Sequence, residues 1–397
     1  MCYYIDMKNL LSLLLVFMIL FFSSAKLLDG YTSSDKKAIK SDDTYTSDQK
    51  GSASFTFVGV GDNLIHQALW GRQEEAGQEF NFDSYYELTN KYTQAADLAF
   101  INSETLCAGE EFGLSHYPVF NGPTQILDAV NKAGFDWLAL SSNHTLDMGP
   151  EGVIYELNWL KEKYPHITVT GSHVSEEAAN TCQIIDVNGI KVGVLGYTYG
   201  LNGYSLPEDK PWLIDLIDED KIKADLEKLS KESDVQIVSM HWGTEYNTGV
   251  DDAQYDLAKK LNEWGAEVII GTHPHVIETA EIIHGADQDT LCYYSLGNFL
   301  SAQDAAARMI GGMASFTLNY NFDEKKTTFT DVKFIPTITY LNPSFTEFRT
   351  TTIHEYTDDM NANQYVTSLG DPCSRAYVIE YVQEVVGNPE GIEVVLN

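Results

Sequence analysis

Residues 265–278 read GAEVIIGTHPHVIE, a short apolar run that ends in two histidines. The segment Val268–Ile270 is apolar and β-branched, which is typical of a buried strand. His273 and His275 follow it, and Pro274 between them restricts the backbone, so the two imidazoles can point at neighbouring metal ions. An HxH pair that faces solvent can arise by chance, but its place directly after an apolar strand favours a ligand role.

Working outward from this stretch, strand-like and helix-like segments alternate along most of the chain. The expected strands are residues 55–60, 98–101, 137–140, 168–170, 190–196, 235–240 and 268–270, and the expected helices are residues 83–95, 124–133, 152–163, 219–231 and 253–264. This alternation predicts an α/β fold in which a mostly parallel sheet carries helices on its faces. In such sheets the ligand site lies beyond the carboxyl ends of the strands.

Polar side chains of metal-ligand type follow several of these expected strands. They are Asp62, Asn102, Glu104, Asn143, His144, His241, His273 and His275. Nitrogen and oxygen donors without thiolates favour Zn, Mn, Fe or Mg over a soft-metal site. Their number exceeds what one tetrahedral ion needs, so two divalent metal ions that share a carboxylate account for them better.

Each of these signals has a plainer interpretation when it stands alone. Asp62 could cap the next helix, and Asp147 in SSNHTLDMG (141–149) could cap the helix expected from about Pro150. Coincidence at so many strand ends is much less plausible than one shared site. The sequence therefore predicts that these side chains converge on one rim of the sheet.

The order of these motifs resembles the CapA family, the poly-γ-glutamate capsule biosynthesis proteins of the metallophosphoesterase-like (calcineurin-like) superfamily. The matching stretches are FVGVGD (57–62), ADLAFINSET (96–105), GFDWLALSSNHTLDMGPEG (134–152), NGIKVGVLGYT (188–198), VSMHWGTEY (238–246), GAEVIIGTHPHVIE (265–278) and YYSLGNF (293–299). The resemblance implies a four-layer α/β/β/α sandwich of the metallo-dependent phosphatase type. It places the metal centre at the strand ends.

The resemblance also implies roles for individual residues. Asp62 and His275 would bind the first metal ion, Glu104 would bridge both ions, and Asn143, His241 and His273 would bind the second. His144 would be the catalytic residue that protonates the leaving group or steadies the developing charge.

This chain departs from the superfamily pattern in its first two motifs. Asp62 is followed by Asn63 and Leu64 instead of an Asp-x-His pattern, and whether His66 reaches the metal stays open. The second motif has Asn102-x-Glu104 in place of GDxxD, which puts phosphatase-like activity in question. Candidate substrate-binding residues are His66, Asn102, Glu245 and Asn298, although a structural turn explains Asn298 equally well.

Composition narrows the classes of protein further. The chain has 397 residues, 44% of them hydrophobic, which excludes a disordered chain. A formal net charge of −33 repels phosphate backbones and makes nucleic acid an unsuitable partner. The five cysteines form no CxxC pair, so a disulfide framework or a thiolate zinc site is not expected. Arginines that could clamp a phosphate are few, and Arg72 is the nearest in sequence to Asp62.

The ends of the chain predict where the protein works. Residues 1–25 contain an apolar run from Leu10 to Phe22 followed by Ser23-Ser24-Ala25, which indicates a signal peptide or an N-terminal membrane anchor. Residues 26–54 are polar and predict a disordered linker. Residues 55–304 form the CapA-like domain, and residues 305–397 a hairpin completing the second sheet plus an irregular tail. We therefore expect an extracytoplasmic protein, secreted or anchored to the membrane.

Two function classes follow from the sequence. In the first, the protein is an exported metal-dependent hydrolase or transferase that acts on a phosphoester or on a γ-glutamyl cell-surface polymer. In the second, it is a non-catalytic scaffold or export subunit of a capsule synthesis complex. The expected partners are an anionic polymer such as poly-γ-glutamate and membrane-bound capsule synthesis subunits. Such a polymer would be repelled by so acidic a chain unless divalent ions or a local basic patch offset the field.

Overall fold

The computed structural model describes residues 50–397. The predicted export signal and most of the predicted linker lie outside these described residues. The first strand, β1, spans Ser52–Asn63, so the folded part begins slightly before the expected boundary at residue 55. Among the described residues, no helix combines the length and the apolar character needed to cross a bilayer.

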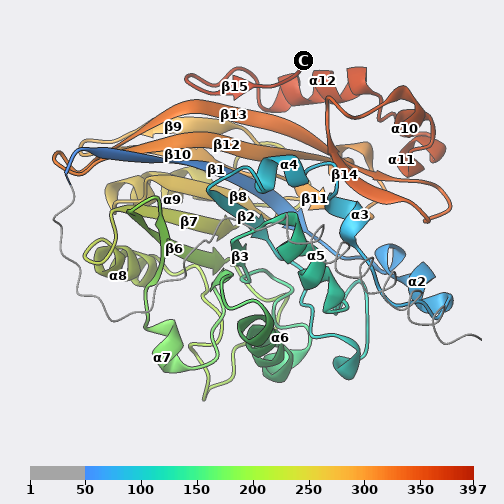
Figure 1. Cartoon of the computed structure of the whole chain (residues 1–397), viewed down its shortest axis with the longest axis horizontal. Coiled ribbons are helices and arrows are strands. Elements are labelled where there is room, and N and C mark those ends of the chain that lie inside the picture. Colours follow the sequence, from blue (N-terminus) through green and yellow to red (C-terminus); the bar gives the residue numbers. More distant parts are fainter. Residues whose placement is uncertain (1–49) are drawn as a thin grey trace, which may run out of the picture. The chain divides into compact units, whose positions relative to one another are not determined.

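The first sheet has nine strands, and its centre is β1 (Figure 1). Its other strands are β2 (Leu98–Asn102), β3 (Trp137–Ala139), β4 (Thr168–Thr170), β11 (Asn298–Leu300), β12 (Ile310–Asn321), β13 (Lys326–Leu341), β14 (Phe348–Thr352) and β15 (Glu393–Val394). The order is β14-β13-β12-β1-β2-β3-β4, with β11 paired to β1 and β15 to β13. From β1 to β4 the strands are parallel, whereas the pairs β1–β12, β12–β13 and β13–β14 are antiparallel.

The second sheet has six strands in the order β5-β6-β7-β8-β10-β9. They are β5 (Gln183–Val187), β6 (Ile190–Thr198), β7 (Val235–His241), β8 (Val268–Thr272), β9 (Ala280–His284) and β10 (Asp289–Tyr293). The four central strands are parallel, and the two edge strands are antiparallel. Within each sheet the parallel strands therefore end at one edge, as a site at strand ends requires.

Alternating side chains of β8 show that the second sheet is covered on both faces. Val268 and Ile270 belong to the large core that also contains residues of the first sheet, while Ile269 joins a second core with Leu257 and Leu261. These two leucines lie on helix α9 (Asp252–Glu263). Because successive residues of a strand point to opposite faces, one face of this sheet packs on the first sheet and the other on helices.

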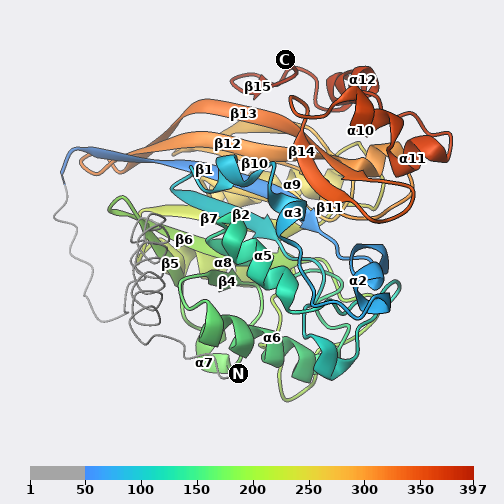
Figure 2. The same ribbon diagram turned by 45° about the vertical axis from the view of Figure 1, so that its right-hand side comes forward.

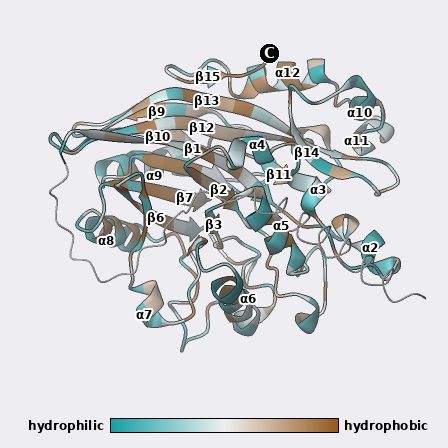
Figure 3. Cartoon of the chain, in the orientation of Figure 1, coloured by the Kyte–Doolittle hydropathy of each residue, from teal (hydrophilic) through white to brown (hydrophobic). Residues whose placement is uncertain are grey.

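Helices lie on the outer sides of the two sheets (Figures 1 and 2). Besides α9 they are α2 (Gly71–Glu75), α3 (Asp83–Tyr86), α4 (Asn90–Thr93), α5 (Gln125–Ala133), α6 (Gly149–Lys163), α7 (Glu176–Ala179), α8 (Glu219–Leu229), α10 (Asp358–Ala362), α11 (Tyr365–Ser368) and α12 (Arg375–Val385). Three short 3₁₀ helices span Gln67–Leu69 (η1), Glu110–Phe112 (η2) and Ala306–Met309 (η3). The predicted α/β/β/α arrangement is confirmed, and Figure 3 shows the hydrophobic residues concentrated in the central strands.

Local capping explains where the helices α8 and α9 begin. The Asp218 side chain accepts a hydrogen bond from the Lys221 backbone N–H at the start of α8. At the start of α9, Asp251 and Gln254 form a reciprocal capping box. Each cap satisfies backbone N–H groups that the first helical turn leaves without partners.

The C-terminal part differs from the sequence prediction. The expected hairpin is present as β12 and β13, but it extends the first sheet along β1 and not the second sheet. The tail is not irregular, because it contains β14, three helices and β15. Val378 and Val382 of α12 are fully buried, so this segment packs on the body of the protein. The single helix expected over residues 83–95 is divided into α3 and α4.

Candidate metal centre

The candidate site lies where strands of both sheets end. Asp62 in β1 pairs with Asn102 at the end of β2, and His241 at the end of β7 pairs with Thr272 at the end of β8. Glu104 follows β2 by two residues. Parallel pairing thus places the last residues of these strands at one edge, which is why segments far apart in sequence meet there.

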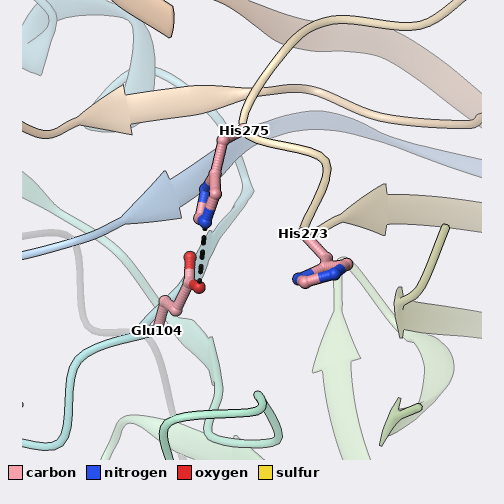
Figure 4. Close-up of side chains that lie close together, drawn as sticks. All are labelled: Glu104, His273 and His275. Atoms are coloured by element: carbon pink, nitrogen blue, oxygen red, sulfur yellow. Dashed lines mark ion pairs between the residues drawn. The ribbon is translucent and has the colours of Figure 1, made fainter. Parts of the chain in front are cut away.

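Glu104, His273 and His275 form a group that could hold a metal ion. One ligand atom from each lies within 4.8 Å of the others, and all three residues are buried. Figure 4 shows the Glu104 carboxylate facing the His275 imidazole, with the His273 ring beside them. The His275 Nε2 to Glu104 Oε1 distance is 3.5 Å. One carboxylate and two imidazoles are a common donor set for divalent transition metals.

Unpartnered polar atoms test whether this group suits a cation. Both carboxylate oxygens of Glu104, Nδ1 of His273 and Oδ1 of Asn102 are buried and have no hydrogen-bond partner. Buried polar atoms in proteins are normally bonded, and a buried carboxylate without a partner is costly. A divalent cation among these atoms would satisfy them, so the donor set fits a metal ion.

His241 and Asn143 extend the donor group on one side. His241 Nε2 lies 2.9 Å from Asn143 Oδ1 and 3.8 Å from Glu104 Oε1. The other ring nitrogen, Nδ1, lies 3.0 Å from Thr272 Oγ1. An Nδ1–H that donates to this hydroxyl would leave the Nε2 lone pair free for a metal ion placed between His241, Asn143 and Glu104. The residues predicted for the second ion therefore do meet in space.

Asp62 is surrounded by donors. Its Oδ1 accepts a hydrogen bond from Asn102 Nδ2 at 2.8 Å, and its Oδ2 lies 3.1 Å from His275 Nδ1. The backbone N–H of His273 also donates to this carboxylate at 3.3 Å. Asp62 thus turns the His275 ring so that Nε2 faces Glu104, as carboxylates behind metal-binding histidines do. Its role as a direct ligand stays a prediction.

Burial and neighbouring charges shift the pKa values of the site residues in different directions. Burial lowers the pKa of His275, but the carboxylates of Glu104 and Asp62 outweigh it and raise this pKa to about 9. Burial and neighbouring imidazoles lower the pKa of His273 to about 3 and hold that of His241 well below its usual range. Burial raises the pKa of Glu104. Neutral His241 and His273 are the protonation states that a metal ligand requires.

The backbone around the two histidines is strained. His273 and His275 have φ values of +98° and +60°, and Tyr246 in the neighbouring loop has φ of +65°. Non-glycine residues seldom adopt positive φ, and such residues gather at functional sites. The turn at Pro274 is therefore fixed by its surroundings, and its histidines point inward.

His144 belongs to a separate pair at the rim of the group. Its Nδ1 lies 2.8 Å from Asp147 Oδ2, and both side chains are buried. The same Asp147 oxygen accepts a hydrogen bond from the Phe120 backbone N–H at 2.6 Å. The predicted capping role of Asp147 is wrong, because the N-cap of α6 is Met148 and no side chain caps it. Asp147 instead orients His144, a role that sequence reasoning missed.

The four candidate substrate-binding residues lie in different places. Asn102 is inside the group. His66 is half-buried at the edge, where its Nδ1 lies 3.2 Å from the Leu64 carbonyl and 3.3 Å from the Ala302 backbone nitrogen, and desolvation lowers its pKa to about 4. Asn298 lies behind His275, with Oδ1 3.0 Å from His275 Nδ1. Glu245 is exposed in the loop after β7.

Two further side chains lie near the site, and of these only Arg308 was not indicated by the sequence. Arg308 lies over the ring of Tyr246, with Cζ 3.7 Å from the ring centroid. The Tyr199 ring lies 4.4 Å from the His273 ring. The aromatic stretch 197–199 indicates a rim residue or ordinary loop packing, and Tyr199 lies beside His273. Arg308 follows no expected parallel strand.

Comparisons with known proteins agree with the sequence resemblance. Residues 56–303 match the family model described as bacterial capsule synthesis protein PGA_cap. The chain is 29% identical over 188 residues to the PGA biosynthesis protein CapA of Bacillus subtilis, covering 47% of this chain and 48% of that protein. It is 29% identical over 184 residues to the capsule biosynthesis protein CapA of Bacillus anthracis, covering 45% and 43%. The chain thus matches about half the length of these curated relatives or less.

Solved structures are more distant. A phosphatase from Mycoplasma pneumoniae has 13% identity and a TM-score of 0.43, with coverage of 72% of this chain and 93% of that chain. A putative 5'-nucleotidase from Staphylococcus aureus has 16% identity and a TM-score of 0.45, with coverage of 72% and 54%. The match to the family model spans more than half of the sequence, and the chain belongs to the PGA_cap family of bacterial capsule synthesis proteins.

Proposed function

We propose that this protein is a metal-dependent hydrolase or transferase of capsule biosynthesis, with a dinuclear centre that acts on a phosphoester or on a γ-glutamyl cell-surface polymer. The observation that carries this proposal is the buried Glu104 carboxylate, which has no hydrogen-bond partner and faces His275 and His273. A buried carboxylate that lacks hydrogen bonds destabilises the fold unless a cation compensates it, and the ion pair of Glu104 with His275 at 3.5 Å compensates it only in part.

The residues divide into holding and proton-transfer roles. His275 would hold one ion, His273 with His241 and Asn143 would hold the second, and Glu104 would be shared by both. The chemistry that divalent ions supply in such a site is polarisation of the attacked group and activation of water. Asp62 keeps the His275 ring oriented through Nδ1.

His144 is placed to move a proton. Its Nδ1 is held by Asp147 at 2.8 Å, which leaves Nε2 to give a proton to the departing atom. The edge of the Phe120 ring packs against this imidazole, with centroids 4.7 Å apart, and limits its rotation. An oriented imidazole beside a metal-ligand group is the arrangement that acid catalysis of leaving-group departure needs.

Metal content and catalysis are tested on the purified full chain. Mass spectrometry should find about two ions per chain after loading with Mn or Zn, and the His273→Ala, His275→Ala double variant should lose them. The loaded protein would then be screened against phosphoesters and γ-glutamyl peptides. No bound metal under either loading condition would remove the hydrolase proposal and leave the scaffold alternative.

We also propose that the protein works outside the cytoplasmic membrane, beside membrane-bound capsule synthesis subunits. The apolar run from Leu10 to Phe22 supports this proposal. Fusion of residues 1–54 to a reporter enzyme that is active only after export should give activity, and Leu14→Arg in the apolar run should abolish it. Equal reporter activity with and without this segment would contradict export.

A further inference from the structure

Two exposed tyrosines stand beside the candidate metal centre. Tyr199 is 47% exposed and Tyr246 is 44% exposed, although both rings adjoin buried imidazoles. The Tyr246 and His275 ring centroids are 6.0 Å apart. Large aromatic side chains that remain half open next to a buried polar group are typical of a ligand-binding rim.

Tyr246 is fixed to the metal-binding turn. Its backbone N–H donates to the Pro274 carbonyl at 2.7 Å, between the two histidines. Its φ of +65° is maintained by this contact although a tyrosine disfavours it. The ring therefore has a defined place relative to His275.

Arg308 completes the rim from the other sheet. It lies on η3, just before β12, and its guanidinium stacks on the Tyr246 ring at 3.7 Å. The Arg308 carbonyl accepts a hydrogen bond from Asn298 Nδ2 at 2.9 Å, and Asn298 Oδ1 in turn lies 3.0 Å from His275 Nδ1. Both ends of Arg308, backbone and side chain, are thus tied to the surroundings of His275.

The guanidinium keeps donors available. Within residues 50–397, its side-chain ion pair is between Nη1 and Asp304 Oδ1 at 3.0 Å, and the Asp304 side chain is 70% exposed. Nε and Nη2 form no hydrogen bond in this part of the chain. A guanidinium has five N–H donors in a planar fork that suits carboxylate or phosphate oxygens. An exposed ion pair is weak, so Asp304 does not prevent such binding.

We propose that Arg308, stacked on Tyr246, is a substrate-binding residue that takes an anionic group of the substrate, a carboxylate or a phosphate, next to the bond that is cleaved. This inference rests on the proposed function. It explains how a chain with a net charge of −33 accepts an anion, because the guanidinium supplies local positive charge at the rim. It also gives the site a preference for substrates that carry negative charge near the reacting group.

Direct binding tests this role without relying on turnover. The metal-loaded and metal-free proteins would be titrated calorimetrically with inorganic phosphate and with glutarate, which represent the two sources of anionic oxygen. Arg308→Gln should weaken binding of the preferred anion about 10-fold or more, since a charged hydrogen bond is lost. Arg308→Lys should restore part of the affinity, because it keeps the charge without the planar fork.

Arg72→Gln is the matched control. Arg72 also pairs with a nearby carboxylate, Glu75, at 3.3 Å, and it is 60% exposed on α2. This variant should bind both anions like the wild type, and the unfolding temperatures of all variants should agree. Loss of glutarate binding alone in Arg308→Gln assigns a carboxylate, and loss of phosphate binding alone assigns a phosphate. Equal affinity in Arg308→Gln and wild type, or no anion binding by the wild type, would overturn the inference.

Failure of the proposed Arg308 role can be distinguished from failure of the proposed hydrolase function. If the wild type binds an anion through Arg308 but hydrolyses nothing with any metal, the anion site stands and the hydrolase proposal fails. If the wild type hydrolyses a substrate and Arg308→Gln leaves the KM for anionic and neutral substrates equally unchanged, the hydrolase stands and the anion role of Arg308 fails.

Discussion

Gly271 connects the packing of strand β8 to the position of the candidate metal-binding residue His273. It lies in β8, two residues before His273. A Cβ atom at this position would lie 1.8 Å from the Tyr294 carbonyl oxygen and 2.7 Å from Trp242 Nε1. Both distances are far below van der Waals contact, and one of the atoms belongs to the backbone. The substitution Gly271→Ala therefore forces the strand and its neighbour apart.

The cost can be worked out from the contacts that would be lost. Trp242 Nε1 donates to the Tyr294 carbonyl at 2.9 Å, and the Leu296 N–H donates to the Gly271 carbonyl at 3.0 Å. Breaking two buried hydrogen bonds and overpacking the core together cost about 3–5 kcal/mol. Because His273 follows so closely, we also expect Gly271→Ala to weaken metal binding.

The assay is urea unfolding followed by tryptophan fluorescence, together with metal content after loading. Gly200→Ala is the control, since a Cβ there has no atom within 4 Å and the backbone φ is not positive. This control should change the free energy of unfolding by no more than about 0.5 kcal/mol. A Gly271→Ala protein within about 1 kcal/mol of wild type would refute the reasoning, because it would mean that the strand end yields easily.

Three more predictions concern the buried acids and the imidazole at the rim. Divalent metal at 100 times its Kd should stabilise the wild type by about 2.7 kcal/mol in thermal unfolding, and Glu104→Gln should lose this gain while Glu267→Gln keeps it. His144→Gln should lower kcat by about 10²–10⁴-fold with unchanged metal content, and Asp147→Asn should lower it less, as steady-state kinetics would show. Burial raises the pKa of Glu267 from 4.5 to about 8, so the folded protein retains a proton that the unfolded chain has released. Stability should therefore fall as pH rises from 5 to 8, and a pH series of urea unfolding should give a flatter profile for Glu267→Gln.

The ligand-type residues at the strand ends could be predicted from the sequence because the pattern that marks them is local. Each apolar run, such as Val235–Met240, ends directly in a polar residue of ligand type, here His241. Parallel pairing then brings these ends together whatever lies between them. The convergence of Glu104, His241 and His273 could be predicted without knowledge of the loops.

Long-range pairing and packing could not be predicted in this way. The hairpin of β12 and β13 alternates like any edge hairpin, and nothing in its own residues shows that β12 pairs with β1. Asp147 could be assigned to a helix cap or to His144, since both roles use the same local spacing, and only the start of α6 decides between them. Arg308 is close to His275 because η3 precedes β12, so its role depends on the sheet that the hairpin joins.

These long-range contacts help to explain how an acidic protein could bind an anionic substrate. The bulk of the chain repels negative charge, and the buried carboxyl groups of Asp62 and Glu104 offer an anion no positive charge. Bound cations would add positive charge there, while Arg308 supplies a fixed positive charge a short distance away on Tyr246. Anion binding should therefore be strongest when metal is loaded and Arg308 is present, and weaker when either is removed. Acceptance of an anionic substrate would then be favoured where the metal-binding turn, Tyr246 and Arg308 meet.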